Sequence, residues 1–426
     1  MPRLRIFRSN RNEQSPHEVD RPRVLFVSHE ATRTGAPKII LNILKRFHEA
    51  CDIDCETIVH DEGHLMEEFA QNSEVHCLRL PRLRSTELQK RVRNIVRRRG
   101  TKHPDIAICN SMESRFVMEQ LNQLGVPVIA LVHELPCSYT DADYELLYEN
   151  TTKIVFPVQT VREATNKKLP LPFGKDLILP QGLLNPHFGQ NTEREAARAQ
   201  IRRDLSIPQD AFVVLGCGTL DLRKGIDHFA AIARSVVRKN NFDDTIHFVW
   251  VGEGPRWSHS PMHYVQIDLR RSKTASHVHF VGEREHVDSF FVGSDMFLLS
   301  SRVDPFPCVV HEAMSTQLPV MAFDNSGGAS IALADGAGFV VPFGDYEQAT
   351  NIICALAQNP GMAEGMRRKA LQRVQDEYNF ENYADKIINV AQQLTGETLI
   401  SSQAPAASNA FETSPAATPI EINRAA

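Results

Sequence analysis

The sequence lacks any long apolar run. None of its stretches approaches about 18 consecutive apolar residues, so no helix is expected to span a membrane. Residues 1–10 are interrupted by Arg3, Arg5 and Arg8 and offer no apolar segment of a secretory signal. We therefore expect a cytoplasmic protein, and a basic segment described below extends this expectation to the inner face of the membrane.

Paired cysteines are also missing. The eight cysteines are spread singly along the chain, most of them beside predicted strands, and are interpreted as small buried side chains in a reducing compartment. Cys51 and Cys55 are four residues apart, but no second pair or His couple completes a zinc site with them. A disulfide framework is therefore not expected.

Charge of one sign is not in large excess. The 47 Lys and Arg residues against 52 Asp and Glu residues give a formal net charge of -5, which argues against a dedicated nucleic-acid binder. Residues 79–102 are the exception, with ten basic residues against one acidic residue, Glu87. This segment is interpreted either as a solvated helix face or as a peripheral contact with anionic lipid headgroups. It lacks the interleaved aromatic residues that nucleic-acid binding would favour.

The remaining composition, 42% hydrophobic and 23% charged, is typical of a globular protein, and the length of 426 residues favours two domains. Short β-branched runs alternate with stretches of helical period, which predicts parallel strands joined by crossover helices. The runs are 24–27, 57–59, 106–109, 128–132, 154–156 and 177–179 in the first half, and 212–215, 246–251, 278–281, 296–299, 320–323 and 339–341 in the second. We therefore predict an α/β protein with two doubly wound domains.

Changes in composition suggest the boundaries. A polar, turn-rich segment at 185–191 separates the halves, and 17 of the last 26 residues are Ala, Ser, Thr or Pro. The predicted division is a disordered basic tail at 1–22, a first domain at 23–188, a second domain at 189–375, a C-terminal helix at 376–397 that packs back on the first domain, and a disordered tail at 398–426.

The most informative motif follows the predicted strand at 296–299. Pro305 and Pro307 keep Asp304 out of a helix interior, so a helix begins at about Pro307 to Val309 with Glu312 in its first turns. Two carboxylates then flank the free amides of a helix start. This arrangement suits a nucleotide sugar, whose diol would bind carboxylates and whose diphosphate would face amides, although a capped helix explains it as well.

Two further motifs are glycine-rich. The spacing Gly216-x-Gly218-x-x-Asp221 lacks the third glycine of a dinucleotide fingerprint, which disfavours a nicotinamide or flavin site. Arg223 and Lys224 at a predicted helix start offer two cations for a diphosphate, or are surface charge. Paired glycines within 325–329 allow a ligand to approach the backbone closely.

Together these residues resemble the nucleotide-sugar-dependent, retaining glycosyltransferases of family 4, the group 1 glycosyltransferases. Asp304 to Glu312 matches the acidic-x7-Glu signature, Arg223-Lys224-Gly225 the phosphate-binding Lys-Gly, and Val132-His133-Glu134 the loop with the active-site His, while Gly35 falls on the first glycine-rich loop. The resemblance runs from 24 to 393. It implies the GT-B fold, in which two Rossmann-like, doubly wound domains face each other across a cleft, the first on the acceptor side and the second binding the nucleotide sugar.

The resemblance also implies roles for single residues. Glu312 would bind the ribose diol, Lys224 and Arg223 the diphosphate, and Asp304 a sugar hydroxyl, with His133 near the anomeric carbon. The other implied donor-binding positions are Gly35, Gly218, Phe306, Pro307, Cys308, Val309 and Val310. The donor would be UDP- or GDP-linked, no cofactor or metal would be required, and the acceptor would be a glycan or lipid-linked molecule of cell-surface polysaccharide or glycolipid synthesis.

Some positions depart from the family pattern. Thr219 stands where Arg is common, and Ile331 lies near the position of a usual Glu. These departures leave open a nucleotide-binding regulatory or scaffold protein on the same fold, and a phosphorylase or epimerase is a further alternative. Acceptor contacts are expected from first-domain loops around Arg82, Glu113 and 139–144.

Overall fold

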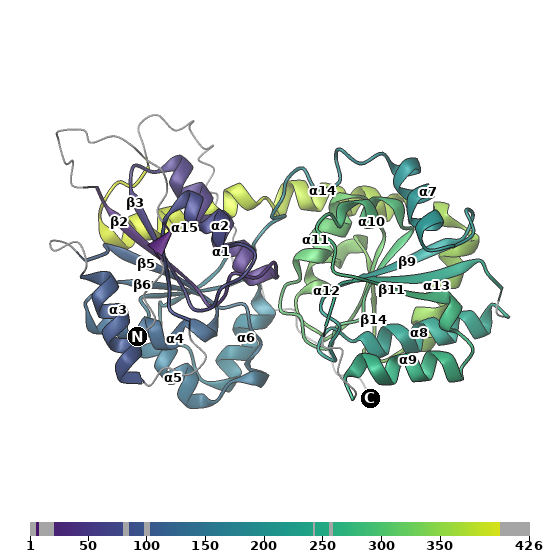
Figure 1. Cartoon of the computed structure of the whole chain (residues 1–426), viewed down its shortest axis with the longest axis horizontal. Coiled ribbons are helices and arrows are strands. Elements are labelled where there is room, and N and C mark those ends of the chain that lie inside the picture. Colours follow the sequence, from purple (N-terminus) through teal and green to yellow (C-terminus); the bar gives the residue numbers. More distant parts are fainter. Residues whose placement is uncertain are drawn as a thin grey trace, which may run out of the picture.

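The structure, a computed structural model, describes residues 6–7, 21–79, 85–97, 103–241, 243–254 and 259–400. Two β-sheets, each with helices on both faces, form two domains that lie side by side (Figure 1). All twelve runs predicted as strands belong to these sheets. The predicted α/β class with two doubly wound domains is therefore confirmed.

The first sheet has the strand order β1-β4-β3-β2-β5-β6-β7-β8, and its pairs are parallel except β1 with β4. Its strands are β1 (Ile6–Phe7), β2 (Arg23–Ser28), β3 (Asp54–Val59), β4 (Glu74–Cys77), β5 (Ile106–Asn110), β6 (Val128–Leu131), β7 (Lys153–Phe156) and β8 (Asp176–Ile178). The sequence did not predict β4, because its four residues include only one β-branched side chain, Val75. The prediction of a disordered tail at 1–22 needs correction at β1, which adds an antiparallel edge to β4.

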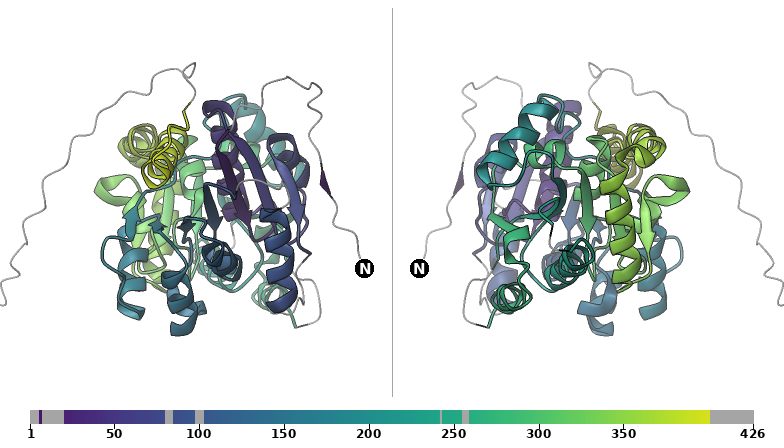
Figure 2. Two further views of the ribbon diagram at one scale, coloured as in Figure 1. Left: turned by 90° about the vertical axis from the view of Figure 1, so that its left-hand side faces the viewer. Right: turned by 90° about the vertical axis from the view of Figure 1, so that its right-hand side faces the viewer.

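Helices cover both faces of the first sheet. One face packs on α1 (Gly35–Ala50), α2 (Met66–Asn72) and α15 (Phe380–Thr395), and the other on α3 (Ser85–Val96), α4 (Arg115–Gln123), α5 (Asp141–Glu149) and α6 (Gln159–Lys168). The C-terminal helix α15 lies against α1, as the two side views also show (Figure 2). Arg46 on α1 donates two hydrogen bonds to Asp385 on α15, at 2.7 and 3.1 Å.

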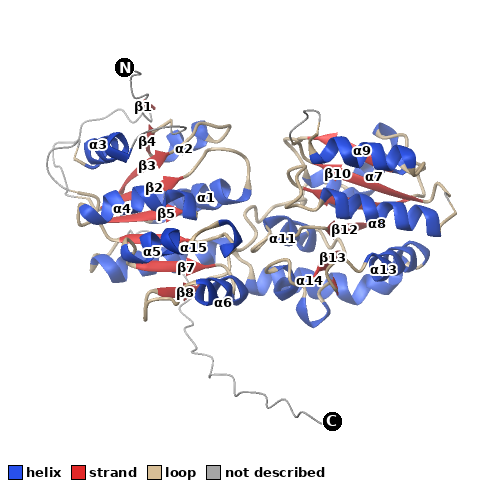
Figure 3. Ribbon diagram, turned by 90° about the horizontal axis from the view of Figure 1, so that it is seen from below, coloured by secondary structure: helices blue, strands red, loops and turns tan. Residues whose placement is uncertain are grey.

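The second sheet is entirely parallel, with the order β11-β10-β9-β12-β13-β14. Its strands are β9 (Phe212–Cys217), β10 (Ile246–Val251), β11 (Val278–Gly282), β12 (Met296–Leu299), β13 (Val320–Phe323) and β14 (Phe339–Val341). Helices α8 (Ile226–Lys239), α9 (Pro261–Arg271) and α13 (Tyr346–Gln358) cover one face; α7 (Arg194–Asp204), α10 (Asp288–Gly293), α11 (Cys308–Ser315), α12 (Ala329–Ala332) and α14 (Glu364–Glu377) cover the other (Figure 3). Among the described residues, no helix is long and apolar enough to cross a bilayer.

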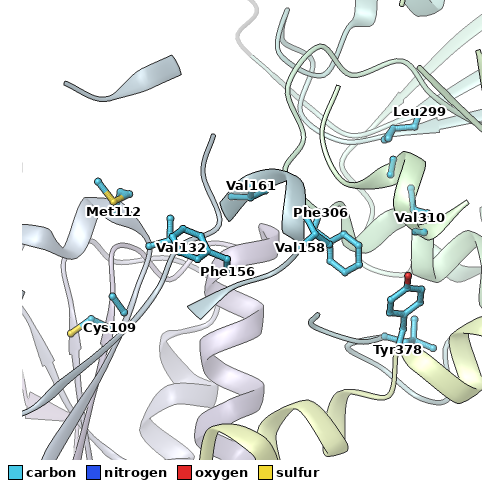
Figure 4. Packing of buried hydrophobic residues seen from close by; sticks show 14 of the residues in the cluster. Cys109, Met112, Val132, Phe156, Val158, Val161, Leu299, Phe306, Val310 and Tyr378 are labelled. Carbon is cyan, nitrogen blue, oxygen red and sulfur yellow. The ribbon is translucent and has the colours of Figure 1, made fainter. Parts of the chain in front are cut away.

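The chain passes between the domains twice, and the two crossings lie side by side. The amide of Leu183 donates to the carbonyl of Tyr378 at 2.8 Å, and an ideal Cβ atom at Gly182 would lie only 2.2 Å from the same oxygen. One apolar cluster continues through this junction, where Val158 of the first domain lies near Phe306 of the second (Figure 4). The domains therefore share buried surface as well as two connections.

Two predicted boundaries shift slightly. Phe188, placed at the end of the first domain, packs edge-on against Phe291 of α10 with ring centroids 5.3 Å apart, because the chain has already crossed. The predicted start of the tail at 398 needs correction, because Leu399 is buried and Ile400 bridges Cys51. Residues 401–426 and most of 1–20 lie outside the described residues.

Candidate active site

The loop after β12 carries Asp304 and is braced by the loop after β13. The amide of Asp304 donates to the carbonyl of Ser326, and the amide of Gly328 donates to that of Pro305, both at 2.7 Å. Gly327 has a φ of +140°, and an ideal Cβ atom there would lie 1.9 Å from the carbonyl oxygen of Asp304. The paired glycines therefore permit a close approach to the protein's own acidic loop.

Lys224 and Asp304 form an ion pair between neighbouring loops of the second domain. Lys224 Nζ lies 2.6 Å from Asp304 Oδ2, and the hydroxyl of Ser301 donates to the same oxygen at 3.2 Å. Asp304 is only 6% exposed. Gly225, with a φ of +71°, packs so tightly that a Cβ atom would lie 1.8 Å from the carbonyl oxygen of Ser300. Contacts within this domain thus fix both charges before any ligand binds.

Three other residues of the loop between β9 and α8 surround the ion pair less closely or are exposed: Gly218, Thr219 and Arg223. Gly218 lies under the aliphatic part of Lys224, where an ideal Cβ atom would be 3.5 Å from Cδ of the lysine. Arg223 is exposed and donates from Nη1 to the carbonyl of Val303 at 3.3 Å, so it stands at the rim of the ion pair. Thr219 is exposed as well.

Helix α11 begins at Cys308, within the predicted range, and Pro307 is its N-cap. Two of the implied donor-binding positions offer no free amide: Pro307 has no N–H, and the amide of Val310 donates to the carbonyl of Pro307 at 3.1 Å. The carbonyl of Phe306 accepts a hydrogen bond from Gln181 Nε2 of the first domain at 3.0 Å. Of the predicted donor-binding positions at this helix start, only Phe306, Cys308 and Val309 therefore have amides that can face an anion.

Glu312 is influenced by the charge of a lysine of the other domain. It lies one turn after Cys308 and is partly exposed. Burial raises the pKa of Glu312, while the positive charge of Lys38 on α1 lowers it. The sequence interpretation missed Lys38, although a lysine in the first turn of the helix after the first glycine-containing loop was a usable signal.

The starts of α1 and α11 also approach each other. An ideal Cβ atom at Gly35, the first residue of α1, would lie 3.6 Å from Cys308 Sγ. Because helix starts carry partial positive charge, an anion between them would meet two such ends together with Lys38 and Lys224. Gly35 therefore lies beside the start of α11 in the second domain.

His133 belongs to a hydrogen-bond chain within the first domain. Its Nε2 lies 2.9 Å from Asn110 Oδ1, and Asn110 Nδ2 donates to the carbonyl of Ala36 at the start of α1 at 2.8 Å. Burial, with the nearby charge of His29, lowers the pKa of His133 to about 4, so the ring is neutral at pH 7. Because Asn110 Oδ1 can only accept, Nε2 carries the proton, and the buried Nδ1, which has no partner within the described chain, is an acceptor.

Glu134 holds the loop that bears His133. Its carboxylate accepts hydrogen bonds from the hydroxyl of Ser111, the amide of Met112 at 3.2 Å and the amide of His133 at 3.0 Å. Burial raises the pKa of Glu134, and these donors oppose the rise. The sequence interpretation gave Glu134 only as part of a motif, and it missed Asn110. A polar residue at the carboxyl end of a buried strand, as Asn110 is, could have indicated a site residue.

A further ion pair joins the domains at their surface. Arg33, in the loop before α1, donates from Nη2 to Glu285 Oε1 at 2.9 Å, and Glu285 lies in the loop after β11. Both side chains are more than a third exposed, at 38% and 67%. Such a pair contributes little energy but sets which loops face each other.

Comparisons with known proteins give the family context. Residues 211–359 match the family described as Glycosyl transferases group 1. The lipopolysaccharide core biosynthesis glycosyltransferase LpsD of Rhizobium meliloti (strain 1021) is 24% identical over 200 residues, which cover 47% of this chain and 54% of the relative. Alpha-D-kanosaminyltransferase of Streptomyces kanamyceticus is 21% identical over 287 residues, covering 64% of this chain and 72% of the relative. The chain thus spans about half the length of the first of these relatives.

Among solved structures, a crystal structure of Anabaena HepE in complex with UDP and glucose superimposes with a TM-score of 0.75. The superposition covers 87% of this chain and 100% of that chain, at 16% sequence identity. At this identity the likeness establishes the arrangement of both domains.

Proposed function

We propose that the chain, which has the GT-B fold and whose residues 211–359 match the group 1 glycosyltransferase family, transfers a sugar from a nucleotide-sugar donor to an acceptor hydroxyl. The observation that supports this most strongly is the fixed Lys224–Asp304 pair, with Glu312 under the influence of the positive charge of Lys38 from the other domain. Cations, carboxylates and helix starts are thereby gathered where a diphosphate and two sugars would need them.

Each group has a distinct task in the proposed donor complex. The diphosphate lies between the starts of α1 and α11 and is neutralised by Lys224 and Lys38. The carboxylate of Glu312 accepts hydrogen bonds from the ribose diol, and that of Asp304 accepts one from a sugar hydroxyl. Anabaena HepE was solved with UDP and glucose, which supports a uridine diphosphate donor here.

The transfer proceeds with retention of anomeric configuration, in line with the resemblance to retaining enzymes. The bond from the anomeric carbon to the diphosphate oxygen breaks, and the acceptor oxygen bonds to the same face. The acceptor's proton goes to the departing phosphate oxygen. His133, with its neutral ring, lies near the anomeric carbon in this scheme. Since lysines and helix starts offset the leaving charge, the scheme needs no metal.

The acceptor is a glycan or lipid-linked molecule of cell-surface polysaccharide synthesis. LpsD is by name a lipopolysaccharide core enzyme, which supports this class. Helix α3 buries Leu88 and Val92 and exposes Lys90, Arg93 and Arg97, so its outer face suits anionic lipid headgroups. Arg82, Arg84, Arg98, Arg99 and Lys102 of the same basic segment lie outside the described residues.

The proposal can be tested with a panel of UDP-, GDP- and ADP-sugars. We expect a UDP-sugar to raise the melting temperature, and release of UDP to depend on an acceptor extract. Glu312→Gln should reduce both the shift and the release. Donor binding without acceptor-dependent release would instead indicate a regulatory nucleotide-binding protein. Activity that persists in a chelator would support the metal-free scheme.

Docking at the membrane needs a separate measurement. We expect the full chain to bind vesicles that contain anionic phospholipid and to bind neutral vesicles weakly. Lys90→Glu combined with Arg93→Glu should abolish this difference, while Lys224→Met should leave it intact. Equal binding of the α3 variant and the unchanged chain would contradict the lipid contact.

A further inference from the structure

Three histidines and an aspartate gather at one edge of the second sheet. Asp244 lies in the loop before β10, His247 on β10, His277 at the end of the 3₁₀ turn Ala275–His277, and His279 on the edge strand β11. Phe248 pairs with Val278 and Val249 with His279. Because side chains alternate along parallel strands, the three histidines project from one face of the sheet.

This cluster is remote from the residues assigned to sugar transfer. His247 lies near the amino end of β10, whereas Val251 at the carboxyl end pairs with Cys217, beside Gly218. The carboxyl ends of the strands carry the loops of the candidate active site. The histidine cluster therefore needs an explanation of its own.

Ligand atoms converge within the cluster. Asp244 Oδ1 lies 3.0 Å from His247 Nε2, and one potential ligand atom from each of Asp244, His247 and His277 lies within 4.8 Å of the others. The rings of His247 and His277 stack with centroids 5.2 Å apart. These two histidines are 2% and 4% exposed. Nε2 of His247 is buried, and the carboxylate oxygen of Asp244 lies beside it.

His279 orients the central ring. Its Nε2 lies 3.2 Å from Nδ1 of His247. A proton on His247 Nδ1 that is donated to His279 Nε2 leaves the lone pair of His247 Nε2 directed at Asp244 and His277. This is the usual way in which a metal-binding imidazole is held.

We propose that Asp244, His247 and His277 bind a divalent transition-metal ion of the zinc class, with His279 as a positioning residue. Two neutral imidazoles and a carboxylate are donors that zinc prefers, and a water molecule would complete four-coordination. Metal–ligand bonds of about 2.0–2.1 Å correspond to ligand separations of about 3.4 Å in a tetrahedron. The Asp244 and His247 ligand atoms, 3.0 Å apart, are within about 0.4 Å of this separation, and the ligand atom of His277, within 4.8 Å of both, would move closer on metal binding.

The ion would have a structural effect on the donor-binding domain. It would join the loop before β10 to the start of β11, and so fasten the edge strand of the second sheet at the end away from the active site. It would also bind the buried Nε2 of His247 and offset the negative charge of the Asp244 carboxylate beside it. Sugar transfer would not use the ion in its chemistry.

The test is zinc binding by the chelator-treated full chain, measured by equilibrium dialysis and by thermal unfolding with added zinc chloride. We expect one zinc ion per chain and a higher melting temperature. Asp244→Asn and His277→Gln should each weaken binding by at least about tenfold. Asp244 is exposed, so its substitution should leave the fold intact, which circular dichroism will verify.

A matched control uses exposed histidines outside the cluster. The double variant His259→Gln/His263→Gln should bind zinc as the unchanged chain does. His279→Ala should bind zinc more weakly but retain the stoichiometry, and cobalt bound to the unchanged chain should give a four-coordinate visible spectrum that His277→Gln loses. Unchanged affinity in the Asp244 and His277 variants, or an equal loss in the control, would overturn the proposal.

Discussion

The two domains fix their site residues by different means. In the second domain, Lys224 and Asp304 are locked together by an ion pair and by glycines that allow backbones to touch. In the first, His133 is held by hydrogen bonds through Asn110 to the start of α1, and the positive charge of Lys38 acts on Glu312 of the second domain. Donor binding should therefore depend mainly on the preorganised second domain, while the first contributes groups that act when the domains meet.

The largest expected effect tests the ion pair. Lys224→Met should lower kcat/KM for the donor by about 10²- to 10³-fold, because a fixed cation at the leaving diphosphate is lost. Arg223→Met, at the exposed rim, should cost less than about fivefold. Steady-state kinetics with Lys224→Arg as a charge-retaining control will compare them. Equal losses at 223 and 224 would contradict the central place of Lys224.

Backbone packing in the second domain comes next. Gly327→Ala should reduce the free energy of unfolding by about 3 kcal/mol or more, because a methyl group would collide with the carbonyl of Asp304 and its positive φ is unfavourable. Gly344 has a φ of +82°, and an ideal Cβ atom there would have no neighbour within 4 Å. Gly344→Ala should therefore cost only the conformational free energy of about 1 kcal/mol. Urea unfolding of both variants measures the difference. Similar losses would show that the loop can move.

A buried histidine in each domain allows a comparison by pH. Burial lowers the pKa of His311 to about 3, and burial with the charge of His29 lowers that of His60 to about 3. Below pH 6.5 the unfolded chain takes up the proton first, so stability falls as pH decreases towards 3. At pH 5 each ring should account for a loss of about 2 kcal/mol relative to neutral pH.

Replacement of either ring should remove its share of the pH dependence. We expect His311→Leu and His60→Leu each to be less sensitive to acid than the unchanged chain, in unfolding free energies measured at pH 7.5 and pH 5. A pH dependence that survives both substitutions would mean that neither imidazole is held neutral.

Lys38 tests the contribution of the first domain. Lys38→Met should lower kcat/KM for the donor by about tenfold, since one charged contact to the diphosphate is worth about 1.5 kcal/mol. Its positive charge also lowers the pKa of Glu312, so the acid limb of the pH–rate profile should move to higher pH. If Lys38→Met lowered kcat/KM as much as Lys224→Met does, the two domains would contribute equally to donor binding, which would contradict the comparison above.

The smallest effect is expected at the surface. Arg33→Ala should raise KM for the donor by less than about fivefold, because the Arg33–Glu285 pair is exposed. The effect should disappear at 0.5 M salt and in a double-mutant cycle with Glu285→Ala. Salt-independent coupling between these two positions would show that the pair does more than align the loops.

Sequence patterns predicted most of the fold because buried parallel strands are continuous apolar runs. Strand β4 was not predicted, because Glu74 and His76 alternate with its apolar residues and interrupt the run. The acidic loop was predictable because Pro305 and Pro307 act locally. The roles of Lys38 and Asn110 were not predictable, because the residues on which they act are far away in the sequence.

The same limit applies to the histidine cluster. His247 and His277 are 30 residues apart in sequence and meet only because β10 and β11 pair. The sequence interpretation considered zinc at Cys51 and Cys55, where spacing suggested it, and the structure instead gathers nitrogen and oxygen ligands in the other domain. Spacing finds sites within a loop, whereas pairing of strands creates sites that no spacing reveals.

Helix α15 has a consequence for the order of events during synthesis. Phe380, Tyr383, Ile387 and Leu399 belong to the core of the first domain, although they are made after the second domain is complete. The second domain can therefore acquire its core while the ribosome is still extending the chain. The domain translated first has to wait, without the cover that α15 adds to α1 and α2 on one face of its sheet, until about residue 400 has emerged.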